Sequence, residues 1–379
     1  MLKITGIKKA VGYYKWAYRA SWYWDLMLDR LTGEVWTDAF PSLNEWNVYH
    51  DEAIINLGRI MIENGLDITM VTVKQAAEEV CKEYGRVKKN DVLFEVDDSD
   101  VLTKMETYCS GENITIPSTL PNGRVIREIA EGFCCGKFNK ITISDGIAVK
   151  AGAFRDADVN EVFWNDYPII PSHCFEESSL KKIHNIGHVC EIGKRAFFHC
   201  ELSRITWPKG CTRIPNECFE CCYHLKEIYG INNVTHIGKR AFKECDDLCK
   251  IKWPANCLDI PYACFFDCRK LTYFNMPKNA KTVGRFAFKG SGVKEIVWPD
   301  ECGVIPYRCF CDSALEKLTN IAHVSRIDSE AFSHACSLNH LDLTKCPISH
   351  IGQRAFEKVD MNSVSAPYYM DEAEFSRLF

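Results

Sequence analysis

A phrase of about 22 residues recurs along most of this chain. It reads Ile-(Gly or Pro)-x-x-(Ala or Cys)-Phe-x-x-Cys, followed by Leu-x-x-Ile-x-x-Pro. Eleven phenylalanines anchor the phrase, and successive ones are 21 to 24 residues apart: Phe133, Phe154, Phe175, Phe197, Phe219, Phe242, Phe265, Phe288, Phe310, Phe332 and Phe356. Such regular spacing predicts an array of structural repeats, each packed on its neighbours.

Each repeat contains a short extended stretch whose side chains should alternate between two faces. In one repeat Ile251 and Trp253 point inward, and Lys250 and Lys252 point outward. Pro254 then ends the strand, because proline cannot donate to a β-ladder. One unit cannot bury its apolar face alone, whereas a stack of units buries a continuous core. We therefore predict a solenoid of short strands and turns over residues 111–367.

A second period overlies the first between Phe175 and Phe332. One kind of repeat reads Ile-Pro-x-x-Cys-Phe and begins at Ile170, Ile214, Ile260 and Ile305. The other kind carries alanine before the phenylalanine, at Ala196, Ala241, Ala287 and Ala331. A structural unit of two repeats, about 45 residues, is therefore a second interpretation of the array.

The phrasing resembles that of the BspA-like leucine-rich repeat family. The AF-x-x-C-x-x-L pattern is explicit in Ala241-Phe242-Lys243-Glu244-Cys245-Asp246-Asp247-Leu248. The resemblance covers residues 112–367 and implies a leucine-rich-repeat-type solenoid of about 11 repeats of 21–24 residues. It also implies a right-handed array with a binding face, of the kind found in bacterial surface adhesins and some protozoan proteins.

Cysteine is abundant, with 21 residues, and twelve of them follow the repeat in three columns. The columns are Cys174, Cys218, Cys264 and Cys309 before the phenylalanine, Cys200, Cys222, Cys245, Cys268 and Cys336 after it, and Cys211, Cys257 and Cys302 after the proline. We interpret these residues as small apolar core groups. Disulfides within the second column, and a zinc site at Cys218-x-x-Cys221 or Cys309-x-Cys311, are the less favoured alternatives.

Tryptophans also recur, just before the proline in every second repeat. Trp207, Trp253 and Trp298 occupy this position, with Met276 as an equivalent, and Trp164 lies near the same place. An exposed aromatic stripe would suggest a platform for carbohydrate or peptide. The strand alternation instead places these side chains inside, so we predict that they belong to the core.

The outward strand positions are the better candidates for binding. They form a mixed column of charged and aromatic side chains, and tyrosine and arginine are typical interface anchors. The predicted site residues are Arg204, Glu227, Tyr229, Lys250, Lys252, Tyr273, Asn275 and Glu295. The alternative is that each is simply a solvated strand residue.

Residues 1–110 do not follow the repeat and predict a small aromatic-rich α+β domain. We expect helices over residues 51–64 and 73–84, a hairpin near residue 31 and a strand over residues 92–96. Asp51 is more simply a helix cap than part of a catalytic or metal cluster with His50 and Glu52. Asp97, Asp98 and Asp100 predict an acidic turn. At the other end, residues 368–379 should cap the array.

Composition limits the classes of function. The net charge is −5, which does not favour nucleic acid as a partner, and no long apolar run predicts membrane insertion. Without a signal peptide pattern the default compartment is the cytoplasm, or the cell surface if a leader was removed. We find no catalytic constellation and no phosphate-binding loop, so no cofactor or metal is expected.

The predicted function is a non-enzymatic scaffold that binds another protein through the outward strand face, with the oligomeric state left open. Two alternatives remain: an N-terminal domain with an enzymatic or effector activity targeted by the repeats, and a bacterial cell-surface adhesin.

Overall fold

The computed structural model describes residues 86–89, 92–107, 112–120 and 123–379. The chain divides into two compact units, one of residues Met1–Ser110 with Thr119–Ile126, and one of residues Gly111–Ser118 with Arg127–Phe379. The expected hairpin, both N-terminal helices and the Asp51 cap lie outside the described residues.

The described part of the first unit includes a short antiparallel meander of β1 (Arg86–Lys89), β2 (Val92–Val96) and β3 (Val101–Thr107). The strand predicted over residues 92–96 is confirmed. The turn between β2 and β3 holds the three aspartates. A side-chain oxygen of Asp97 accepts the backbone N–H groups of Ser99 and Val101, at 2.9 and 3.0 Å. The acidic turn is thus an aspartate-capped turn.

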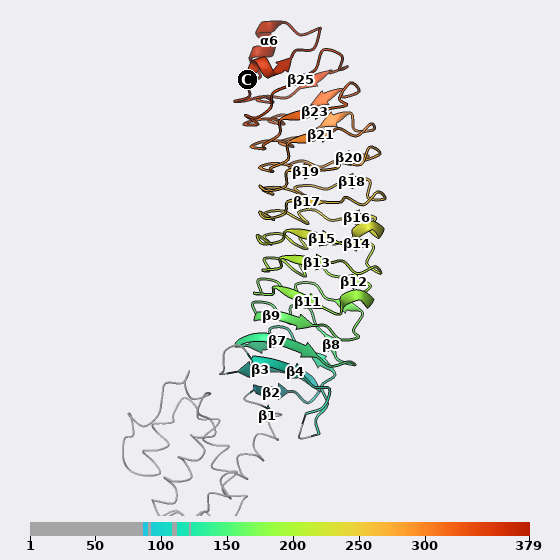
Figure 1. The fold of residues 1–379 in the computed structure, drawn as a ribbon, viewed down its shortest axis with the longest axis vertical. Coiled ribbons are helices and arrows are strands. Elements are labelled where there is room, and N and C mark those ends of the chain that lie inside the picture. The colour runs from blue at the N-terminus through green and yellow to red at the C-terminus, as the bar shows by residue number, and fades with distance from the viewer. Residues whose placement is uncertain (1–85, 90–91, 108–111, 121–122) are drawn as a thin grey trace, which may run out of the picture. The chain divides into compact units, whose positions relative to one another are not determined.

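The second unit is the predicted solenoid, in which each turn contributes one strand to each of two rows (Figure 1). In the first row, parallel strands of successive turns pair in register, as Arg204–Thr206 does with Glu227–Tyr229. The first row consists of β4 (Glu112–Ile116), β7 (Lys137–Ile143), β9 (Asp158–Phe163), β11 (Lys182–His184), β13 (Arg204–Thr206), β15 (Glu227–Tyr229), β17 (Lys250–Ile251), β19 (Tyr273–Phe274), β21 (Glu295–Val297), β23 (Lys317–Thr319), β25 (Leu341–Asp342) and β27 (Val364–Ser365).

The second row has shorter strands, most of which end at the isoleucine of an Ile-Gly or Ile-Pro step. It consists of β5 (Glu128–Ile129), β8 (Ala148–Val149), β10 (Ile169–Ile170), β12 (Glu191–Ile192), β14 (Arg213–Ile214), β16 (His236–Ile237), β18 (Asp259–Ile260), β20 (Thr282–Val283), β22 (Val304–Ile305), β24 (Arg326–Ile327) and β26 (His350–Ile351). A further two-residue strand, β6 (Cys134–Cys135), follows Phe133 and is not part of this row. The loops that connect the strands contain three 3-10 turns: η2 (Ile186–His188), η3 (Ile231–Asn233) and η4 (Met361–Ser363).

The anchoring phenylalanines form a continuous ladder through the core. All eleven are 0% exposed. From Phe175 to Phe356, neighbouring ring centroids are 5.4–5.8 Å apart, with planes within 20° of parallel. Centroid separations in this range are typical of favourable aromatic pairs, so each ring contributes both area burial and ring–ring attraction.

The turn around each phenylalanine has a conformation that the sequence did not reveal. From Phe175 onward, the residues two before and two after the ring adopt left-handed φ, as Arg240 (55°) and Glu244 (58°) do around Phe242. A left-handed residue that is not glycine costs about 1–2 kcal/mol. The cost is offset because three backbone N–H groups donate to carbonyl groups of the next turn: those of the phenylalanine itself and of the residues two before and two after it. The N–H of Arg240 donates to Tyr262 O at 3.0 Å, and those of Phe242 and Glu244 donate to the next turn in the same way.

The alternation of proline and glycine repeats has a steric basis. A Cβ on Gly193 would lie 2.2 Å from the backbone nitrogen of Ser172, which follows Pro171 in the preceding turn. Gly238 and Gly284 make the same approach to the residues after Pro215 and Pro261, at 2.4 and 2.5 Å. These three glycine turns therefore fit closely on the proline turns before them. Gly352 approaches Ser329, which follows Asp328, in the same way, so glycine rather than proline is what the contact requires.

The cysteines of the array are free thiols from Cys174 to Cys346. In the column after the phenylalanine, Sγ donates to the phenylalanine carbonyl of the preceding turn, as in Cys200 to Phe175 O (2.9 Å) and Cys268 to Phe242 O (2.9 Å). Burial raises the pKa of Cys200 to about 12. The buried thiols of this column are thus small core groups that also bond successive turns. Cys336, its fifth member, is exposed and donates to Lys358 O at 3.5 Å, so the prediction of a core position is wrong for this residue.

The tryptophans lie in the core, as predicted. Trp207 and Trp298 are at most 1% exposed, and Trp253 is also buried. Each indole Nε1 donates to the carbonyl of the cysteine four residues later, for example Trp298 to Cys302 O at 2.7 Å. A buried indole needs such an acceptor. The pairing explains why a tryptophan and a post-proline cysteine recur together in every second turn.

The C-terminal end of the array is covered by α6 (Glu372–Ser376). Asp371 caps this helix by accepting the N–H of Glu374 at 2.7 Å. The ring of Phe379 stacks on Phe356 at 5.3 Å, and the N–H of Phe356 donates to Leu378 O at 3.1 Å. The segment therefore continues the phenylalanine ladder and bonds the last turn.

Candidate functional site

All eight residues predicted for binding lie on one surface of the array, the outward side of the first strand row. We call this surface the strand face and define it by the two outward residues of each turn from β7 to β23. Its two tyrosines are exposed, Tyr229 by 47% and Tyr273 by 66%, while Glu227 is half-buried. Arg204, Lys250, Lys252, Asn275 and Glu295 complete the predicted set, and all five are exposed.

The structure brings four of the predicted residues together around Glu227. Its carboxylate lies 3.3 Å from Arg204 Nε and 3.6 Å from Lys250 Nζ, and accepts a hydrogen bond from Tyr229 OH. The tyrosine hydrogen bond, with the two cations nearby, lowers the pKa of Glu227, and the same bond raises the pKa of Tyr229. Tyr273 pairs in register with Lys250 on one side and Glu295 on the other, so it continues the same column.

The eight predicted residues leave out the N-terminal part of the strand face. Here Phe163 stacks on His184 with centroids 4.1 Å apart, and Lys140 Nζ lies 4.3 Å above the Phe163 ring. His184 Nε2 also lies 3.0 Å from Glu161 Oε2. The same inward–outward alternation, applied to β9, would have identified Glu161 and Phe163.

Charges on the strand face follow a three-turn pattern. One acid occurs in every third turn of the first outward column, at Glu161, Glu227 and Glu295. Basic residues occupy most of the other turns of the column: Lys140, Lys182, Arg204, Lys250 and Lys317. Lys252 adds a further cation in the second column. The strand face is therefore locally basic in a chain whose net charge is −5.

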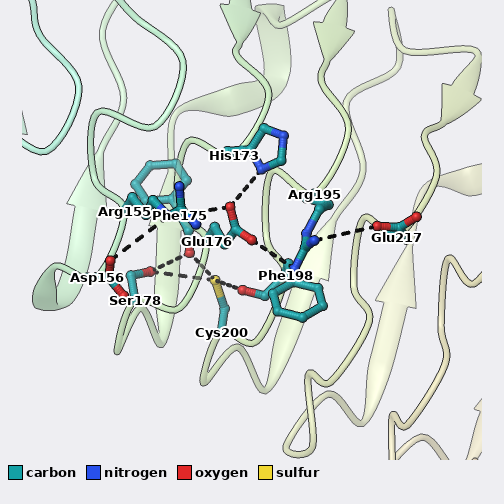
Figure 2. A network of polar contacts seen from close by, with 10 residues as sticks. All are labelled: Arg155, Asp156, His173, Phe175, Glu176, Ser178, Arg195, Phe198, Cys200 and Glu217. Carbon is teal, nitrogen blue, oxygen red and sulfur yellow. Dashed lines mark hydrogen bonds and ion pairs between the residues drawn. The ribbon is translucent and has the colours of Figure 1, made fainter.

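A second polar network lies at the phenylalanine turns (Figure 2). Glu176 is only 2% exposed, and its carboxylate is 2.8 Å from Arg195 Nη2, 2.6 Å from His173 Nδ1 and 3.6 Å from Arg155 Nε. The three partners come from three successive turns. The two arginines compensate the buried carboxylate, so we interpret this network as a tie between turns.

Neighbouring groups in Figure 2 support that structural interpretation. The hydroxyl of Ser178 and the thiol of Cys200 both donate to Phe175 O, at 2.8 and 2.9 Å. Both potential nucleophiles are thus engaged with the backbone. Glu176 and its three charged partners lie two residues before a phenylalanine or one residue after it, and only the stacking of the turns shows that these two positions meet.

Aromatic and basic side chains also meet on the turns around residues 262–308. Phe286 contacts Tyr307 edge-on at 5.2 Å, and Phe266 has Lys243 and Lys289 at 5.6 and 5.1 Å from its ring. These rings are half-buried. Their mutual contacts account for their positions, so the strand face remains the more accessible aromatic surface.

Cavities and metal-binding geometry do not point to a further functional site among the described residues. The described residues contain no cluster of three or more His, Cys, Asp or Glu side chains placed to hold a metal ion. A hollow of about 380 Å³ on the second strand row is lined by Arg213, Asn216 and His236 among others. Burial and the nearby Arg213 lower the pKa of His236. Among the described helices, none has the length and apolar character needed to cross a bilayer.

Comparison with known proteins agrees with this architecture. A family model described as a BspA type leucine rich repeat region matches residues 147–272 and 258–376. No curated protein sequence matches the chain.

Two solved structures are similar to the array. A leucine-rich repeat protein from Bacteroides ovatus is 19% identical, with a TM-score of 0.55, over 76% of this chain and 97% of that one. The pneumococcal vaccine antigen PcpA is 16% identical, with a TM-score of 0.46, over 73% of this chain and 80% of that one. At this identity the first likeness establishes the fold.

Proposed function

Because the chain belongs to the BspA-type leucine-rich repeat family, we propose that it is a non-enzymatic scaffold that binds another protein through its strand face. The observation that carries the proposal is the strand face itself. Exposed tyrosines and cations lie along a row of parallel strands whose backbones are already hydrogen-bonded. Binding by such a surface orders few new groups, which reduces the entropic cost of association.

The size of the strand face suits a protein partner. From β11 to β23 there are six steps between turns, and at about 4.8 Å per step the row is about 29 Å long. A standard interface buries about 800 Å² on each partner, a patch roughly 28 Å across. Tyr229 and Tyr273 lie near the middle of this row, where interface anchors usually concentrate.

Charge reversal on the strand face tests the proposal. The full chain serves as bait in a lysate of its source organism, and captured proteins are compared with those of a variant carrying Arg204→Glu, Lys250→Glu and Lys252→Glu. A matched control reverses Arg213, Lys281 and Arg326, which are exposed on or beside the second strand row. We expect the first variant alone to lose its principal partner. An identical set of captured proteins for both variants and the parent would refute the proposal.

The cysteine thiols bear on the cellular compartment of the protein. Free cysteines line the core, and Cys190, Cys249 and Cys336 are exposed. Exposed thiols persist in reducing compartments and oxidise outside the cell. These features support a location in the cytoplasm rather than at the cell surface. Fractionation that recovers the intact protein only from the surface would contradict this assignment and favour an adhesin.

A further inference from the structure

We propose that the occupant of the strand face is an extended acidic peptide segment, which runs along the array and carries carboxylates three or four residues apart. This inference rests on the proposed function, because it names the chemistry of the partner for the same surface.

The first anchoring point is the step between β11 and β13. Lys182 and Arg204 occupy the same outward column on successive turns, about 4.8 Å apart along the array. Like charges in adjacent positions destabilise a sheet. Arg204 shares Glu227 with Lys250. Lys182 is in register with Glu161, but that carboxylate lies against His184, and Lys182 makes no ion pair with another described residue. A carboxylate placed over this step would relieve the repulsion and contact both cations.

The second anchoring point is β17 and the residue that follows it. Lys250 and Lys252 both point outward, on either side of buried Ile251. The centre of the first point lies about two and a half turns away, which is about 12 Å. An extended chain advances about 3.3 Å per residue, so a spacing of three or four residues covers about 10–13 Å. The spacing of the two cation groups therefore matches two acids in one extended segment.

The acids of the strand face argue against an unbroken polyanion. Glu227 lies between the two anchoring points and Glu295 lies beyond the second. A phosphate or sulfate chain with a charge on every unit would place an anion against each of these carboxylates. A peptide whose two acids are separated by uncharged residues avoids both. Tyr273, exposed by 66%, lies on the next turn and offers a ring face to the peptide beyond its second acid.

Fluorescence anisotropy with synthetic peptides tests the inference on the full chain. The probe is a dye-labelled peptide of about twelve Gly and Ser residues with two Glu four positions apart, and the control peptide carries Gln at both positions. At low ionic strength, where exposed charges are least screened, we expect the Glu peptide to bind at least about tenfold more tightly.

Three variants define where the peptide binds. Lys182→Gln with Arg204→Gln should weaken binding of the Glu peptide at least about tenfold. Lys317→Gln is the matched control, because Lys317 occupies the same column but its neighbours there are Glu295 and His340 rather than a second lysine or arginine. It should change binding less than about twofold. Glu227→Gln should tighten binding, because it releases Arg204 and Lys250 from their internal partner.

Several outcomes would overturn the inference. They are equal binding of the Glu and Gln peptides, equal losses in the Lys182/Arg204 and Lys317 variants, and tighter binding of a single-stranded oligonucleotide or sulfated oligosaccharide at the same site. The proposed function is judged separately by lysate capture. If charge reversal abolishes capture while the Glu peptide fails to bind, the scaffold function stands and the acidic-peptide inference falls.

Discussion

Raising the pH from about 7.5 to 9.5 should strongly destabilise the array, because folding removes many thiols from water. Burial raises the pKa of the eight buried cysteines in the two columns that flank the phenylalanine: Cys174, Cys200, Cys218, Cys222, Cys245, Cys264, Cys268 and Cys309. In the unfolded chain the same thiols titrate near their ordinary pKa of about 8.5. The folded state thus binds more protons than the unfolded state once the pH exceeds that value.

The sign and size of the effect follow from linkage. Because the folded pKa values are raised, this stability is fully present below about pH 8.5 and is lost as the pH rises. One unit above the unfolded pKa, each thiol favours unfolding by RT ln 11, about 1.4 kcal/mol. Eight thiols give about 11 kcal/mol, which is comparable to the whole free energy of unfolding of a typical domain.

Urea unfolding at the two pH values, under reducing conditions, measures the loss in the free energy of unfolding. Tryptophan fluorescence is a suitable probe, because Trp207, Trp253 and Trp298 are buried in alternate turns. A variant with alanine at Cys200, Cys222, Cys245 and Cys268 should lose about half as much stability over the same pH range. Tyrosines titrate above this range, near pH 10, so they contribute little. A loss below about 3 kcal/mol, or equal losses in variant and parent, would refute the reasoning.

Three substitutions probe the packing of the turns. Phe242→Ala should cost about 3–5 kcal/mol, because a ring that is 0% exposed loses stacking partners on both sides. Gly193→Ala should cost about 1–3 kcal/mol through its contact at 2.2 Å, whereas Gly187→Ala, with open space around it, should be nearly neutral. Glu176→Gln should cost about 2 kcal/mol by leaving Arg195 only partly compensated. Denaturant midpoints measure all three.

Each of these predictions has an outcome that contradicts it. A loss from Phe242→Ala no larger than that from Tyr273→Ala, on the exposed strand face, would mean that the phenylalanine ladder does not stabilise the stack. Equal effects at Gly193 and Gly187 would contradict the close fit of glycine turns on proline turns. A neutral Glu176→Gln variant would mean that the network of Figure 2 contributes nothing to folding.

Much of the fold followed from periodicity, and the strand face followed from alternation within each strand. The inward placement of Trp253 and the outward placement of Lys250 needed only the two-residue period of a strand. Alternation does not show which outward side chains contact one another. The contacts of Glu227 with Arg204 and Lys250 depend on the register between turns, and residues about 23 positions apart become neighbours only in the stack.

The sequence by itself determined the repeat, its length, its core residues and the family, because these depend on local pattern repeated many times. Only the tertiary structure decided three other features. These are the left-handed residues on both sides of each phenylalanine, the buried Glu176 network and the close approach of glycine turns to proline turns. Each depends on groups in adjacent turns, where hydrogen bonds and contacts offset local costs that a single repeat could not sustain.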